Sequence, residues 1–278
     1  MDTSAAPWRD VAATETVRSA LGASDRLRTL LAVGEVASTQ DRAREHARDA
    51  GADGTVVLAD LQHRGRGRTG ARWDDDADGG SLALTVLLDV DTTAGALPLL
   101  PHALGVATVE ACLTSGAPHP ALRLKWPNDV VVRDDGPQGR LRKLAGVLVE
   151  RERVPTADGH RDVLLCGIGV NVHLHDAPAA DRTDLATLSG VAPDRPRLLA
   201  ALITALDRTL PLLEDPRRLV GRVRDLSDTL GRRVRVRPPG EEPVVGTATA
   251  IDDAGRLVVD TEGRTRAILS GSVRDEEP

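Results

Sequence analysis

The chain has 278 residues, of which 41% are hydrophobic and 28% charged, with a formal net charge of −6. This balance fits a soluble globular protein with one large core and a small second domain, and it excludes a disordered chain. A pI near 5.7 argues against general coating of nucleic acid, which usually goes with a pI above about 9. Because the sequence contains no Phe or Tyr, the core must consist mainly of Leu, Val, Ile and Ala.

Neither the cysteines nor the N-terminus points to secretion or to a membrane. Cys112 and Cys166 lie far apart and lack CxxC spacing, which is typical of reduced, buried thiols in a cytoplasmic protein. The sequence MDTSAAPWRD has no basic segment followed by an apolar run, so we expect no signal peptide. No stretch approaches the roughly 18 apolar residues of a membrane span. We therefore expect a cytoplasmic protein without membrane association.

The first part of the chain predicts an extension, then a strand and a helix. Residues 1–30 are Ala-rich and polar, with one short helix around residues 14–21, and are too few for a winged or helix-turn-helix DNA-binding domain. Residues 33–54 have the pattern of a strand and an amphipathic helix, with an N-cap at Ser38 or Thr39 and a stop at Gly51.

The rest of the chain predicts an α+β protein that ends in a small β-barrel. Strands are expected over residues 54–62 and 81–90, three times within 121–154, and over 162–172. Helices are expected over residues 97–116, 195–215 and 216–226, the first of them apolar on nearly every side and ending at Gly116. Beyond Leu230, short alternating strands with frequent turns are typical of a barrel of about 50 residues.

Four segments carry side chains suited to chemistry. They are RGRGRTGARW (64–73), LKWPNDV (124–130), RKLAGVLVE (142–150) and GIGVNV (167–172). In the first, glycines allow a ligand close to the backbone, and arginines present forked donors to carboxylate or phosphate. Taken alone, this loop is more typical of a mobile surface loop or an RNA-contacting tract. Because two buried strands anchor it, we interpret it as a cationic lid that a ligand orders.

The other three segments are weak signals individually. In KWPND, Asn128 and Asp129 suit a strand-ending turn, and a chemical role for Lys125 or Asp129 stays open. Lys143 begins an otherwise buried strand, which by itself is typical of a solvated strand end. The glycines of GIGVNV weaken an apolar strand, so a ligand or another backbone is expected to approach them.

Taken in this order and spacing, the four segments resemble the biotin–protein ligase (biotin–[acetyl-CoA-carboxylase] ligase) family. The family pattern is GRGRxGRxW, KWPND, a Lys-Leu-Ala-Gly strand and GIGxNV, and the match runs from about residue 33 to the C-terminus. The resemblance implies a mixed or antiparallel catalytic sheet packed with helices, similar to class II synthetases, over residues 31–228. It also implies an SH3-like barrel over residues 229–278, and the monofunctional type without an N-terminal DNA-binding domain.

The resemblance implies a two-step reaction. Biotin and MgATP give biotinyl-5′-AMP and pyrophosphate, and the biotinyl group then passes to a lysine of a biotin carboxyl carrier domain, such as that of acetyl-CoA carboxylase. Because this chemistry gathers anions, cations must neutralise them, and Arg66, Arg68 and Lys143 match family positions that do so. Lys143 and Arg68 are the expected catalytic residues, and Asp129 is a candidate to help deprotonate the acceptor amine. No protein ligand to Mg²⁺ is assigned, and we expect a monomer or homodimer with no DNA partner.

Further family positions fall on matching residues of this chain. Ser38, Thr39 and Gln40 resemble the hydrogen-bonding set for the ureido ring of biotin, and Trp73 resembles a wall for its aliphatic tail. Thr187 resembles a position on the adenine side. The complete set expected to bind biotin or its adenylate is Ser38, Thr39, Gln40, Gln62, Gly65, Arg66, Gly67, Arg68, Trp73, Lys143, Gly146, Gly169 and Asn171.

The chain departs from the family pattern in the Arg/Gly loop. Ala71 stands where the family usually has an arginine, Arg72 follows one place later, and Arg64 replaces a small residue. Either Arg64 or Arg72 supplies the missing charge, or the adenylate is held less tightly.

Three alternatives remain open. A lipoate or octanoate ligase would share the core fold, but the Arg-Ser-Gly-Gly-Gly loop of those families is absent. A nucleic-acid-binding module could use RGRGR and GRRVRVR, although the acidic balance and the lack of Phe and Tyr argue against it. The alanine in the Arg/Gly loop also raises the possibility of a catalytically inert scaffold.

Overall fold

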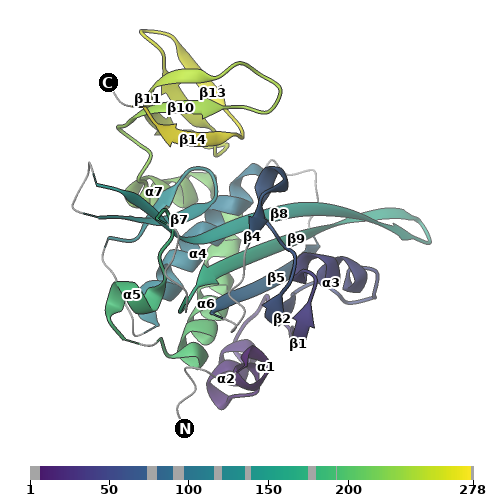
Figure 1. The fold of residues 1–278 in the computed structure, drawn as a ribbon. Helices are drawn as coiled ribbons and strands as arrows, with labels where there is room; N and C mark the ends of the chain where they lie inside the picture. Colours follow the sequence, from purple (N-terminus) through teal and green to yellow (C-terminus); the bar gives the residue numbers. More distant parts are fainter. Residues whose placement is uncertain are drawn as a thin grey trace.

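Seven strands form the central sheet of this protein, in the order β1-β2-β5-β9-β8-β7-β6 (Figure 1). The computed structural model describes residues 7–73, 80–89, 97–115, 121–134, 139–174, 180–191 and 193–276. The strands are β1 (Thr29–Val36), β2 (Thr55–Gln62), β5 (Ser81–Asp89), β6 (Arg123–Lys125), β7 (Asp129–Arg133), β8 (Leu141–Thr156) and β9 (Gly159–Asn171). β1 and β2 run parallel and every other neighbouring pair runs antiparallel, so the sheet is mixed, as predicted.

Helices cover both faces of the sheet. The helices are α1 (Trp8–Ala12), α2 (Glu15–Gly22), α3 (Thr39–His46), α4 (Leu100–Thr114), α5 (Leu185–Ser189), α6 (Arg195–Thr209) and α7 (Pro216–Leu226). α4 and α6 pack together over one face, and α3 covers part of the other (Figure 1). The side chains of β2 point alternately to the two faces of the sheet. Val56 and Leu58 join the large core, and Val57 joins a smaller core beneath α3.

Two predicted helix ends are wrong and one lies outside the described residues. α3 begins at the Ser38 cap as expected but ends at His46, and Gly51 lies in a later turn with φ +81°. The helix predicted over 195–215 ends as α6 at Thr209, because Pro211 supplies no backbone N–H and a 3₁₀ turn follows. Gly116, the expected stop of α4, lies outside the described residues.

The segment Leu97–Thr114 corrects the expectation that no stretch is long and apolar enough for a membrane span. By length and composition alone this one segment of the described chain qualifies, but 67% of it is buried inside the protein. The segment is therefore apolar because it contains a core helix, which packs between the sheet and α6.

The first described residues pack onto the sheet. The Trp8 side chain is fully buried, and its Nε1 donates to the Ser81 backbone oxygen at 2.8 Å. No helix is predicted at this position, whereas α1 places Trp8 and Val11 in the large core. The division into residues 1–30, 31–228 and 229–278 remains a prediction.

The C-terminal strands form a small antiparallel SH3-like barrel beyond α7 (Figure 1). They are β10 (Arg233–Arg237), β11 (Val244–Ile251), β12 (Leu257–Asp260), β13 (Thr265–Ile268) and β14 (Ser272–Asp275), in the order β13-β12-β11-β10-β14. The Gly255 backbone oxygen accepts from Trp126 Nε1 at 3.1 Å and lies 3.0 Å from His102 Nε2. The barrel is therefore tied directly to the KWPND turn.

Candidate active site

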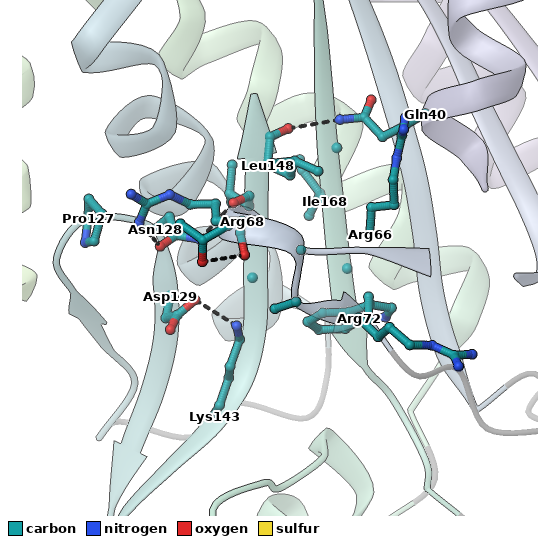
Figure 2. A pocket seen from close by; sticks show the side chains of 18 of the residues that line it. Gln40, Arg66, Arg68, Arg72, Pro127, Asn128, Asp129, Lys143, Leu148 and Ile168 are labelled. Carbon is teal, nitrogen blue, oxygen red and sulfur yellow. Dashed lines mark hydrogen bonds and ion pairs between the residues drawn. The ribbon is translucent and has the colours of Figure 1, made fainter. Parts of the chain in front are cut away.

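A cavity of about 240 Å³ lies beside the N-terminus of α3, where residues 63–73 cross β8 and β9 (Figure 2). We call residues 63–73 the flap. The structure brings into this lining most of the residues predicted from the sequence: Ser38, Thr39, Gln40, Gln62, Arg66, Gly67, Arg68, Trp73, Asp129, Lys143, Gly146 and Gly169. Of the predicted set, Gly65 and Asn171 lie outside it.

The flap is a short β-hairpin. β3 (Gly65–Arg66) pairs with β4 (Arg72–Trp73), and a 3₁₀ turn at Arg68–Gly70 joins them. A Cβ atom on Gly65 would lie 2.4 Å from the Trp73 backbone oxygen, so only glycine allows the two flap strands to approach this closely. Gly65 therefore shapes the hairpin and does not line the cavity.

A pair of glycines forms the floor beneath Trp73. Gly146 on β8 and Gly169 on β9 are register partners, and Asp129 on β7 pairs with Gly146 in turn. A Cβ atom on Gly169 would lie 2.5 Å from Trp73 Cε2, and one on Gly146 would lie 3.2 Å from Trp73 Cζ3. The absence of two side chains thus creates the slot that the indole occupies.

One end of the cavity carries neutral hydrogen-bonding groups. Gln62 Oε1 accepts from the Thr39 backbone N–H at 2.8 Å and from Thr39 Oγ1 at 3.0 Å. Gln40 is 3% exposed, and its Nε2 donates to the Leu148 and Leu165 backbone oxygens, both at 3.3 Å (Figure 2). Its Oε1 is buried without a partner within the described structure. This end can therefore accept a hydrogen bond from a polar, uncharged group.

The other end carries two cations. Lys143 Nζ lies 2.7 Å from Asp129 Oδ1 (Figure 2). It also lies 5.6 Å from the centroid of the Trp73 ring. Arg68 Nη1 donates to Asn128 Oδ1 at 2.9 Å. Burial lowers the pKa of the Arg68 guanidinium, and the negative charge of Asp129 opposes this shift.

A β-bulge aims Lys143 into the cavity. Val130 pairs with Ala145 but Val131 pairs with Lys143, so one residue of β8 is extra at this point. Without the bulge, alternation would place Lys143 on the face opposite to Gly146. In the structure Lys143 Nζ lies 2.9 Å from the position of a Gly146 Cβ atom, which means that both share the cavity face.

Arg66 lines the cavity as predicted, but its guanidinium, like that of Arg72, contacts groups outside the lining. Arg66 Nη2 contacts Asp41 Oδ1 at 2.9 Å and Glu150 Oε2 at 3.1 Å. Arg72 belongs to the lining, but its guanidinium points away from the cavity, because Trp73 faces the floor and strand residues alternate (Figure 2). Its Nη2 donates to the His63 backbone oxygen at 3.2 Å. The Arg64 side chain is exposed. In this structure, therefore, neither Arg64 nor Arg72 brings the charge that the family arginine at position 71 would supply.

Asn171 and Thr187 serve the chain segment that follows β9. Asn171 Nδ2 donates to the Thr183 oxygen at 2.9 Å and to the Lys143 oxygen at 3.3 Å, which braces the start of β8. Thr187 bonds to Asp184 at the start of α5 and lies outside the cavity lining. The expectation that Asn171 faces the ligand space does not match this geometry.

Two parts of the lining were missed by sequence reasoning. Asn128 was assigned only to a turn, yet it accepts from Arg68 and donates Nδ2 to the Val147 oxygen at 2.8 Å. Gly271, Ser272 and Val273 reach the cavity from the barrel. The KWPND motif could have indicated Asn128, whereas no local sequence pattern predicts that a barrel residue lines the cavity. Within the described residues, no group of three or more His, Cys, Asp or Glu side chains could hold a metal ion.

Comparisons with known proteins agree with this geometry. The profile of the biotin/lipoate A/B protein ligase family matches residues 33–171, and that of the biotin protein ligase C-terminal domain matches residues 229–274. The chain is 35% identical to the biotin–[acetyl-CoA-carboxylase] ligase of Mycobacterium tuberculosis over 257 residues, which cover 91% of each protein. It is 27% identical to the bifunctional ligase/repressor BirA of Escherichia coli over 79% of this chain and 66% of that protein. The biotin protein ligase of Aquifex aeolicus, solved with biotin and ATP, superposes with a TM-score of 0.73 at 29% identity, covering 90% of this chain and all of the other.

Proposed function

Because the chain belongs to the biotin/lipoate A/B protein ligase family, we propose that it joins biotin to a carrier protein at the expense of ATP. Biotin is first activated as biotinyl-5′-AMP with release of pyrophosphate. The biotinyl group then passes to a lysine of a biotin carboxyl carrier domain. The neutral polar end of the cavity, the Trp73 wall and the cationic end follow the order of the parts of such a substrate.

The observation that carries this proposal is the linear arrangement within one cavity. The Thr39, Gln40 and Gln62 end offers hydrogen bonds to a neutral polar ring, and the indole of Trp73, which packs on the glycine floor and lines the cavity, offers an apolar wall to an aliphatic chain. Arg68 and Lys143 lie across the cavity from Gln40, and a carboxylate and a phosphate must meet near these two cations (Figure 2). A ligand with a polar head, an apolar tail and an acid group fits this sequence of environments.

The first step requires neutralisation of two anions. The biotin carboxylate attacks the α-phosphorus of ATP, the bond from that phosphorus to the bridging oxygen breaks, and pyrophosphate leaves. Arg68 and Lys143 are proposed to stabilise the charge that develops on the phosphoryl oxygens. The flap excludes water from the resulting mixed anhydride, which water would hydrolyse.

In the second step the acceptor amine must attack the biotinyl carbonyl carbon, and AMP leaves. The amine has to lose a proton, and Asp129 is the only acidic side chain among the described residues of the lining. Its Oδ1 lies 2.7 Å from Lys143 Nζ, which places the carboxylate at the cationic end. We propose Asp129 as the group that assists this proton transfer.

Magnesium is expected to enter with ATP. Mg²⁺ in nucleotide sites is usually held by one or two carboxylates together with the phosphates, and a lining with one carboxylate, Asp129, fits that donor set. When bound, the ion would neutralise phosphate charge. We further propose a cytoplasmic enzyme that is a monomer or homodimer and has no DNA partner.

The test is a transfer assay with labelled biotin, ATP and an isolated biotin carboxyl carrier domain of an acetyl-CoA carboxylase. The expected result is pyrophosphate release that requires both biotin and ATP, followed by label on the carrier lysine. Lipoate and octanoate serve as competing acids in parallel reactions. Preferred transfer of either acid would replace this proposal with a lipoate-type activity, and no pyrophosphate release with any acid would indicate an inert scaffold.

A further inference from the structure

Arg66 is held by two carboxylates that belong to different elements of the protein. Its Nη2 lies 2.9 Å from Asp41 Oδ1 on α3 and 3.1 Å from Glu150 Oε2 on β8. The three side chains are 35%, 46% and 30% exposed, so water weakens this contact without removing it. One flap side chain therefore joins the flap to both α3 and the central sheet.

Arg44 orients the same two carboxylates. Its Nη1 lies 3.0 Å from Asp41 Oδ1 and its Nη2 lies 3.1 Å from Glu150 Oε2, while Nε contacts Glu152 at 2.9 Å. Burial acts to lower the pKa of the Arg44 guanidinium, but hydrogen bonds to Glu152 and Glu150 and the charges of both carboxylates raise it overall. Three carboxylates thus face two guanidinium groups, and Arg44, which is not part of the flap, holds both acceptors of Arg66.

The Arg66 side chain keeps one donor for another partner. Arg66 lines the cavity, and its Nε is buried with no hydrogen-bond partner in the described structure. A buried donor of this kind is costly unless something accepts from it. The opposite side of the flap is fixed independently, because Arg68 donates to Asn128 in the KWPND turn.

We propose that Asp41 and Glu150 are positioning residues that act through Arg66. They hold the flap closed over the activated intermediate, and they leave Nε of Arg66 free to donate to the bound acid. This inference rests on the proposed function for its ligand, but the contact between flap and body does not depend on it. The main role of Arg66 is then to retain the intermediate. It contributes less to neutralising charge in the chemical step.

The decisive variant is Asp41→Asn combined with Glu150→Gln. Both changes keep the side-chain shape and remove the charge, so the flap should open more often. In the absence of carrier, labelled biotinyl-5′-AMP should escape or hydrolyse roughly 5- to 10-fold faster than in the unmodified protein, since charge-assisted hydrogen bonds at half-exposed positions are lost. The rate of pyrophosphate release in the first turnover should stay within about two-fold.

Glu152→Gln is the matched control. Glu152 contacts Arg44 but not Arg66, and its side chain is 23% exposed against 30% for Glu150. Glu152→Gln should lose the intermediate at the unmodified rate. In an Arg66→Gln background, the double variant should add no further acceleration, because its effect passes through Arg66.

The outcomes separate the contact of Arg66 with Asp41 and Glu150, which we call the latch, from the enzyme activity. Equal loss of intermediate in the double variant and in Glu152→Gln, or full acceleration in the Arg66→Gln background, would overturn the inference. Backbone hydrogen exchange of residues 63–73 without any substrate gives a second reading, with faster exchange expected in the double variant than in Glu152→Gln. If the protein forms no adenylate, the proposed function fails, yet this exchange comparison still decides whether the latch exists.

Discussion

Lys143 reaches the cavity only because β8 carries an extra residue beside it. The sequence identifies lysine as a suitable cation for acid activation, and the KLAG motif selects this lysine. Strict strand alternation would nevertheless turn it away from Gly146, and the bulge between Val130 and Val131 reverses that direction. Residue type is thus readable from sequence, whereas the direction of the side chain depends on register with a neighbouring strand.

Loss of the charge of Lys143 or of Arg68 should stop adenylate formation. Lys143→Ala or Arg68→Ala removes a charge that stabilises the transferring phosphoryl group, so the rate of biotin-dependent pyrophosphate release should fall by at least about 100-fold. Lys143 is 36% exposed, so the thermal unfolding midpoint should change little. Normal turnover in a folded variant would show that the cation is assigned wrongly.

The close packing of Trp73 on Gly169 predicts how a substitution at Gly169 affects substrate binding. In Gly169→Ala, the new methyl group would lie 2.5 Å from Trp73 Cε2, so the indole must move out of its slot. The KM for biotin should rise by about 10-fold or more, a loss of roughly 1.4 kcal/mol of binding. Gly221→Ala in α7 is the control, because nothing lies within 4 Å of its new methyl group; an equal rise in both variants would contradict the role of the floor.

At the scale of elements, local sequence patterns predicted the helices, strands and caps that neighbouring residues determine. The Ser38 cap, the apolar α4 and the barrel strands were all read from side-chain order, and the structure contains each of them. Strand order was not readable, because β5 lies between β2 and β9 through pairings that only the assembled sheet defines. The end of α3 was also missed, since the positive-φ glycine at 51 belongs to the turn beyond it.

The flap is the element whose behaviour should change with ligand. Its hairpin has only two pairs of register partners, Gly65 with Trp73 and Arg66 with Arg72. Such a short hairpin is marginal by itself, so residues 63–73 should exchange backbone hydrogens rapidly without substrate and become protected when biotin is added. Mass-spectrometric hydrogen exchange with and without biotin measures this, and equal exchange in both states would contradict the lid.

At the scale of the whole molecule, the barrel completes the site that the sheet begins. The Gly255 oxygen joins Trp126 of the KWPND turn and His102 of α4, and a Cβ atom at position 255 would lie 3.0 Å from His102. Ser272 extends the cavity lining from the barrel side. No single segment encodes this junction, which is why the sequence predicted two domains but not their shared site.

Burial of His102 at this junction should make stability depend on pH. Burial lowers the pKa of His102 from its ordinary 6.5, and the hydrogen bond to Gly255 only partly offsets this. Below pH 6.5 the unfolded chain therefore binds a proton that the folded protein does not, so stability is present above 6.5 and falls as the pH decreases. The unfolding midpoint should drop between pH 7.5 and 5.5 in the unmodified protein and drop less in His102→Gln, whereas parallel curves would contradict this.

Arg133 ties the sheet to both the linker before the barrel and the last strand of the barrel. Its Nε lies 2.7 Å from Asp228 Oδ1 and its Nη2 lies 2.7 Å from Asp275 Oδ2, with Arg133 10% and Asp228 6% exposed. Arg133→Met would keep the aliphatic stem but leave Asp228 buried, with Arg232, 3.4 Å away, as its remaining cation among the described residues. Breaking a buried pair costs about 3–5 kcal/mol, and the remaining arginine places the expected loss near the lower end.

Chemical denaturation of the intact chain measures this loss. The comparison is Arg217→Met, whose partner Asp253 is 56% exposed and whose own side chain is 88% exposed, so removal of that pair should cost about 0–1 kcal/mol. A loss in Arg133→Met no larger than in Arg217→Met would mean that the junction between sheet and barrel rests on the apolar core and the Gly255 contacts. A larger loss, with a parallel fall in adenylate formation, would show that the ion pairs hold the barrel residues of the lining against the catalytic sheet.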